Sequence, residues 1–167
     1  MAVFKESLEK VQNSLEFKEF IDKNPSAKLV SGFFIIDFLS NDSKKSIDYK
    51  KGEDIFIFDL FEDSRVVMKK DELIKGTGHK PLEKINSEIK VEVEDLKGIA
   101  GIKILDEGIH SKMNKIIAVL QRLENKTVWN LTCMLDGLII INMIVDSMSE
   151  EIIKFERKSM MDMIRKR

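Results

Sequence analysis

The segment Lys75-Gly76-Thr77-Gly78-His79-Lys80-Pro81 holds the residues whose types and spacing could best do chemistry. A glycine-rich loop before a helix can present backbone N–H groups to an anion, and the two lysines and the histidine would add positive charge. The segment is not a Walker loop, because the required spacing and the closing Lys-Ser/Thr are missing. It predicts one of two things. The first is a binding site for a small anion or nucleotide, formed by Lys75, Gly76, Thr77, Gly78, His79 and Lys80. The second is a plain turn into a helix that begins at Pro81.

Other reactive side chains are few. His79 and His110 are the only histidines and Cys133 is the only cysteine, a poor set of ligands for zinc. Asp37 and Asp59 lie within apolar runs, where they could form a buried pair with shifted pKa values or face solvent at a sheet edge. No nucleophile elbow, nucleotide fingerprint or metal-binding helix motif is present. The sequence therefore predicts no catalytic residue, no metal and no cofactor, and it leaves enzyme activity as the less favoured reading.

The charge of the chain is nearly balanced but unevenly distributed. The 167 residues include 28 Lys and Arg and 29 Asp and Glu, for a net charge of −1. Residues 1–109 carry −4 and residues 110–167 carry +3. No aromatic platform accompanies the basic residues near the C-terminus, so a nucleic-acid partner is not favoured.

The sequence also bears on location. No apolar run approaches the ~18–20 residues that cross a bilayer, and the run Leu138–Ile141 ends at Asn142. The opening residues 1–6 lack the basic and apolar regions of a signal peptide. We therefore expect a cytoplasmic protein without a membrane span.

The first 75 residues predict a helix followed by strands. An apolar stripe at helical spacing predicts a helix over residues 3–23, with capping-box spacing near its middle that allows a break into two. Runs rich in aromatic and β-branched residues predict strands at Lys28–Leu39, Asp54–Phe61 and Arg65–Lys70. The polar residues 40–53 between them predict a loop.

The rest of the chain predicts a connecting region and a second unit. Five of the eight glycines lie between Gly76 and Gly108, where a short helix is expected from Pro81 to Glu88. Apolar residues at helical spacing then predict a helix over residues 109–124. Strands are predicted at Lys126–Leu135, Leu138–Val145 and Glu150–Glu156. The predicted parts are an N-terminal α+β unit (1–75), a glycine-containing connecting region (76–109) and a C-terminal α+β unit (110–167), which could pack as a single domain.

The dipeptide Asp136-Gly137 predicts a two-residue hairpin turn. That turn would pair Leu135 with Leu138 and place Trp129 on the face that packs on the helix. On the opposite face, one strand would present Ile139, Ile141, Met143 and Val145. An apolar row of this kind needs a cover, either the first half of the chain or a second copy, so these four residues are the candidate interface.

The C-terminal unit carries short motifs of a known family. They are Val128-Trp129-Asn130-Leu131, the Asp136-Gly137 turn, and a strand that runs through Ile144-Val145-Asp146 to Glu151-Ile152-Ile153. Over about 45 residues this pattern resembles the PepSY domain family, although Ser149 and Glu150 stand where the family prefers threonine and glycine. The resemblance implies a cystatin-like shape, with one helix against a curved antiparallel sheet. It also implies a binding or inhibitory module, often associated with peptidases.

The sequence as a whole predicts an α+β fold, an antiparallel sheet with helices packed on one face. The order of elements is compatible with two α-β-β-β repeats. The function predicted first is a non-catalytic binding or interaction protein, PepSY-like, that self-associates as a homodimer or binds another protein through a sheet face. The alternative is a small domain or enzyme that binds an anionic ligand or nucleotide through residues 75–81.

Overall fold

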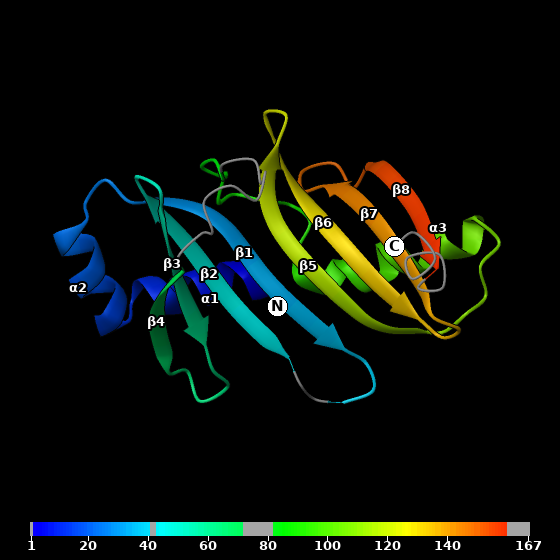
Figure 1. The fold of residues 1–167 in the computed structure, drawn as a ribbon, viewed down its shortest axis with the longest axis horizontal. Coiled ribbons are helices and arrows are strands. Elements are labelled where there is room, and N and C mark those ends of the chain that lie inside the picture. The colour runs from blue at the N-terminus through cyan, green and yellow to red at the C-terminus, as the bar shows by residue number, and fades with distance from the viewer. Residues whose placement is uncertain (1, 41–42, 72–81, 160–167) are drawn as a thin grey trace, which may run out of the picture.

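The computed structural model describes residues 2–40, 43–71 and 82–159 (Figure 1). These residues form one antiparallel sheet of eight strands in the order β4-β3-β2-β1-β5-β6-β7-β8. The strands are β1 (Lys28–Asp37), β2 (Lys44–Lys51), β3 (Asp54–Leu60), β4 (Val66–Asp71), β5 (Met113–Leu123), β6 (Lys126–Leu135), β7 (Ile139–Asp146) and β8 (Ile152–Ser159). The helices are α1 (Val3–Gln12), α2 (Leu15–Lys23) and α3 (Leu96–Asp106), with a 3-10 turn η1 (Val93–Asp95) before α3.

The sheet consists of two four-stranded meanders that meet at their first strands. Strands β1 to β4 follow one another outward on one side, and β5 to β8 do so on the other. At the centre, β1 pairs antiparallel with β5, so that Phe33 lies opposite Val119 and Ile35 lies opposite Ile117. Figure 1 shows this junction, with β1 in blue beside β5 in yellow-green. The part boundaries predicted at residues 75 and 109 stay predictions.

The predicted class, an α+β fold with two α-β-β-β repeats, is wrong, because the sheet and not the helices makes up most of the structure. The fold is mainly β: of the residues that the structure describes, 46% lie in strands and 23% lie in three short helices and a 3-10 turn. The sheet is open and continuous, and each half contributes four strands to it. The extra strands are β2 and β5, which were expected to be a loop and a helix.

Both corrections have a physical reason. In β2, Ile47 and Tyr49 point into the core at alternate positions, but lysines at both ends of the strand hide this short alternation in a polar sequence. In β5 the apolar residues also fit a helical stripe. This strand is at the centre of the sheet, so both of its faces are apolar, and its β-branched residues favour the extended backbone. The predicted strands at 28–39, 54–61, 65–70 and 126–135 are confirmed within one or two residues.

The hairpin between β6 and β7 has a three-residue turn rather than the predicted two-residue turn. Gly137 has φ +83° and Leu138 has φ +61°, so Leu138 belongs to the turn. Leu135 therefore pairs with Ile139, one residue beyond the prediction, and Trp129 pairs with Val145. A shift of one residue exchanges the two faces of a strand. All the β7 residues that were expected outside thus point into the core.

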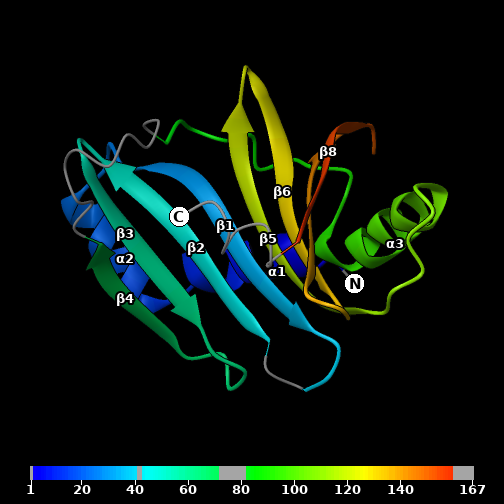
Figure 2. The ribbon, with the colours of Figure 1, turned by 45° about the vertical axis from the view of Figure 1, so that its right-hand side comes forward.

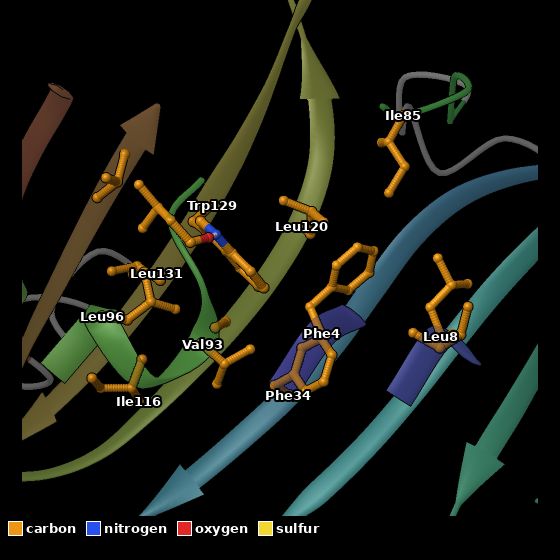
Figure 3. Close-up of a cluster of buried hydrophobic side chains, with 14 of the residues drawn as sticks. Phe4, Leu8, Phe34, Ile85, Val93, Leu96, Ile116, Leu120, Trp129 and Leu131 are labelled. Atoms are coloured by element: carbon orange, nitrogen blue, oxygen red, sulfur yellow. Dashed lines mark hydrogen bonds between the residues drawn. The ribbon is translucent and has the colours of Figure 1, made fainter. Parts of the chain in front are cut away.

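The core lies between the sheet and the three helices. Figure 1 shows α1 behind the strands, with α2 at the left end of the sheet and α3 at the right, and Figure 2 shows α3 beyond β8. At its centre, the rings of Phe4, Phe34 and Trp129 meet edge to face, with centroids 5.8–6.4 Å apart (Figure 3). The Trp129 indole N–H donates to the carbonyl of Val91 at 2.7 Å, which fixes the segment before η1 against the sheet. Trp129 is thus a core residue that joins β6 to the chain entering α3.

Helix starts are held by side chains near and far. The Ser14 hydroxyl accepts from Phe17 N–H and begins α2, so the break allowed by the sequence does occur. Helix α1 has no side-chain cap of its own. Instead the carboxylate of Glu92 accepts from Phe4 N–H at 2.7 Å and from Lys5 N–H at 3.3 Å. No helix forms over residues 82–88, and Pro81 lies outside the described residues.

Candidate functional site

The face of the sheet opposite the helices is the most extensive candidate site. We call it the open face, and Figure 1 looks onto it. The three helices of the described chain all contribute side chains to the core on the other side. Because side chains alternate along a strand, every second residue of each strand points to the open face. This face is therefore the surface that the sheet offers to a partner.

A patch of four apolar side chains occupies the middle of the open face. Phe33 and Ile35 on β1 lie opposite Val119 and Ile117 on β5, and all four are half-buried. None of them belongs to the core cluster or to the apolar residues packed against it. We call these four residues the central patch. It lies across the junction of the two meanders, where the sequence analysis had predicted a helix for one of the two strands.

The surroundings of the central patch are mainly polar. On β6 its neighbours are Asn130, opposite Val119, and Thr132, opposite Ile117. At the end of β1, the Asp37 carboxylate lies 3.7 Å from the Lys115 ammonium. The N–H groups of Leu39 and Ser40 donate to Asp37, and the first of these hydrogen bonds is the main cause that lowers its pKa. Asp37 and Lys115 thus balance each other, and the exposed Lys44 of β2, opposite Ile35, is the remaining charge beside the patch on the β2 side.

A polar cluster lies on the same face over β1 to β4. The Ser31 hydroxyl donates to Asp48 at 2.6 Å, and the Asp59 carboxylate lies 3.2 Å from the Lys69 ammonium. Burial raises the pKa of Asp48 to about 6, against the lowering effect of the Ser31 hydrogen bond. One oxygen of Asp48 and one of Asp59 are buried without a hydrogen-bond partner. Asp37 and Asp59 do not form the buried pair that the sequence allowed, because each has its own lysine partner. Asp48 was not among the candidate residues, because its segment was predicted to be a loop.

Two hollows lie at the margins of the sheet and are lined mainly by residues of the helix side. A cleft of about 660 Å³ lies at the end of β1, with Phe34, Ile36 and Phe38 among its apolar residues and Lys44 and Lys97 among its charged ones. The Lys97 ammonium lies 4.6 Å from the centre of the Phe38 ring. A second groove of about 490 Å³ lies between α2 and β4. Both are large enough for a small ligand or for a few side chains of a partner.

The predicted interface residues do not form a surface. Ile141, Met143 and Val145 are fully buried in the core, and Ile139 packs against it. The hairpin register explains this correction, since the three-residue turn directs them toward the helices. The open-face residues of β7 are instead Ile140, Asn142 and Ile144.

The predicted ligand-binding residues, Lys75, Gly76, Thr77, Gly78, His79 and Lys80, lie outside the described residues, so an anion or nucleotide site there stays a prediction. Cys133 is buried, and burial raises the pKa of its thiol to about 12, which keeps it protonated and unreactive. Among the described residues, no three His, Cys, Asp or Glu side chains gather as metal ligands. None of the described helices is long and apolar enough to cross a membrane.

Comparison with known proteins identifies the fold but no function. No family model matches the chain, and no curated protein matches it. Its fold is similar to that of a crystal structure described as a "putative lipoprotein" from Clostridium difficile 630. The TM-score is 0.57 at 14% sequence identity, over 86% of this chain and 90% of that one. The likeness concerns the fold alone, and the PepSY-like resemblance and the cytoplasmic location stay predictions.

Proposed function

We propose that this chain is a non-catalytic binding protein that self-associates through its open face. The observation that carries the proposal is the central patch of Phe33, Ile35, Ile117 and Val119, which is half-buried on the face away from the helices. Apolar side chains grouped on one sheet face are typical of a surface that a partner covers. The proposal moves the predicted interface from the core-facing residues of β7 to β1 and β5.

A second copy of the chain is the partner that best fits this face. A two-fold interface places one patch against itself, so a charge near its centre would meet its like. Here the centre is apolar, and the nearest carboxylate, Asp37, is paired with Lys115. The nearest cation, Lys44 opposite Ile35, is exposed at the rim of the patch, so two copies can bring their apolar centres together while this ammonium stays in water.

The open face also has the size that a dimer needs. Strands β2, β1, β5, β6 and β7, spaced about 4.8 Å apart and about 30 Å long, present about 700 Å². A standard-size interface buries roughly 800 Å² on each partner. Apolar side chains at the flank, Met134 and Ile140 on paired positions of β6 and β7, extend the surface beyond the central patch.

The oligomeric state tests the proposal. Sedimentation equilibrium of the whole chain over a range of concentrations should show a monomer–dimer equilibrium. Ile117→Lys places a charge in the middle of the patch of both copies and should weaken the dimer by about a hundred-fold, as expected for the loss of a central contact.

The control substitution is Ile102→Lys, on α3, where the side chain is 66% exposed away from the open face. It should leave the dimer unchanged, and circular dichroism should show that both variants fold. A chain that stays monomeric at every concentration would overturn the proposal. So would a dimer that Ile117→Lys does not weaken while the variant remains folded.

A further inference from the structure

Strand β4 ends the sheet on one side and leaves backbone groups free. No strand of the described residues pairs with its outer side. The hairpin before it closes with Phe61 N–H donating to the carbonyl of Arg65, so hydrogen-bonded pairs follow at every second residue. Val67 and Lys69 therefore bond to β3, opposite Asp59 and Ile57. The N–H and C=O groups of the alternate residues, Val66, Met68 and Lys70, point to the free edge.

A groove runs along this edge on the helix side. It has a volume of about 490 Å³ and is lined by residues of α2, β3 and β4. Figure 1 shows α2 and β4 at the same end of the sheet. Its apolar lining comes from Phe20 of α2, Phe56 of β3, and Val66, Val67 and Met68 of β4. Met68 is 41% exposed although it lies beside the Phe20 and Phe56 rings. The free backbone of Met68 and an apolar groove are thus side by side.

The lysines of β4 do not block the edge, although lysines on edge strands usually prevent pairing. The Lys69 ammonium lies 3.2 Å from Asp59 and the Lys70 ammonium lies 3.5 Å from Asp54. Both partners are on β3, so the two side chains are drawn back over the sheet, away from the free side of β4.

The rim of the groove on α2 is mainly acidic. Glu16 and Glu19 line it, together with Lys23. Within the described residues, neither glutamate has an ion-pair partner, unlike the acidic residues next to β4. A cationic group that entered the groove would find these two carboxylates available.

We propose that this groove binds an extended peptide that adds to β4 as a ninth strand. The peptide would exchange backbone hydrogen bonds with Met68 and its neighbours at the free edge. Alternate side chains would point into the groove, so the fitting sequence has a central apolar residue and basic residues two positions before and after it. The apolar residue would contact Phe20 and Phe56, and the basic residues would pair with Glu16 and Glu19. The site is independent of the open face.

Fluorescence anisotropy with a labelled peptide tests this inference on the full chain. The probe is Thr-Lys-Thr-Val-Thr-Lys-Thr, whose lysines and valine fall on one side of an extended strand. Two control peptides separate the two contributions, one with both lysines replaced by glutamate and one N-methylated at alternate residues on the edge-facing side. We expect saturable binding of the probe and at least ten-fold weaker binding of each control.

Variants of the protein locate the site. The double variant Glu16→Lys with Glu19→Lys should weaken binding at least ten-fold, and Glu9→Lys, an exposed residue of α1, should not change it. Met68→Pro removes an N–H that points away from β3, so the variant should still fold but should bind the probe peptide more weakly. No binding up to about 1 mM would overturn the proposal. Equal binding of the N-methylated peptide would also overturn it, as would binding that none of the groove variants affects in folded protein.

Discussion

The helix cap from Glu92 leads to a specific prediction about stability. Its carboxylate accepts from the N–H groups of Phe4 and Lys5 at the start of α1, and it also accepts from Val93 N–H at the start of η1. Glu92→Ala removes the cap of two helical segments at once. Losing one cap costs about 0.5–2 kcal/mol, and losing a negative charge near a helix N-terminus costs about 0.3–1 kcal/mol more.

Glu92→Ala should therefore lower the free energy of unfolding by about 2–3 kcal/mol, and Glu92→Gln, which keeps one acceptor but not the charge, by about 1 kcal/mol. Urea denaturation followed by circular dichroism measures both. Glu88→Ala, an exposed glutamate four residues earlier, is the matched control and should change stability by less than about 0.5 kcal/mol. Hydrogen exchange should be faster at the amides of Phe4 and Lys5 in Glu92→Ala. A Glu92→Ala protein as stable as the Glu88→Ala control would refute the reasoning.

Three further substitutions test the core and the open face. Trp129→Phe leaves the Val91 carbonyl without its donor and should cost about 2–4 kcal/mol in urea denaturation, combining the lost hydrogen bond and the smaller ring. Gly32→Ala places a methyl group 3.2 Å from the Phe4 ring and should cost about 1–3 kcal/mol, with a matching fall in melting temperature. Asp48 has a pKa of about 6 in the folded protein, against an ordinary value of 3.8. The folded state therefore holds the proton more tightly, so the free energy of unfolding is highest below about pH 4 and falls as the pH rises through 6. Asp48→Asn should thus gain stability relative to the natural chain between about pH 4.5 and pH 7.5, and a constant difference across that range would contradict the assignment.

Much of the sheet could be predicted from local patterns, and the exceptions have identifiable causes. Strands β1, β3 and β6 are long runs of apolar and β-branched residues, so their sequence and their position in the sheet agree. Strand β5 is apolar on both faces because it is central, and such a strand cannot be told from a buried helix by periodicity alone. Strand β2 has too few apolar residues to stand out from its lysines.

The candidate site could be predicted less well, because it depends on register and on distant contacts. A single added turn residue, Leu138, moved the predicted interface of β7 into the core. The central patch requires the pairing of β1 with β5, which no local pattern specifies. The Glu92 cap likewise joins residues 88 positions apart. Whether each of these residues is exposed or buried can be decided only once the topology of the sheet is known.

The most direct test of the open-face dimer is an intermolecular nuclear Overhauser measurement. A mixture of copies with labelled isoleucine methyl groups and of deuterated copies with protonated aromatic rings reports only contacts between copies. We expect signals from the Ile35 and Ile117 methyl groups to the Phe33 ring of the other copy. Intermolecular signals that come only from residues outside the open face, such as Ile102 on α3, would contradict the central claim, as would their absence at concentrations where sedimentation shows a dimer.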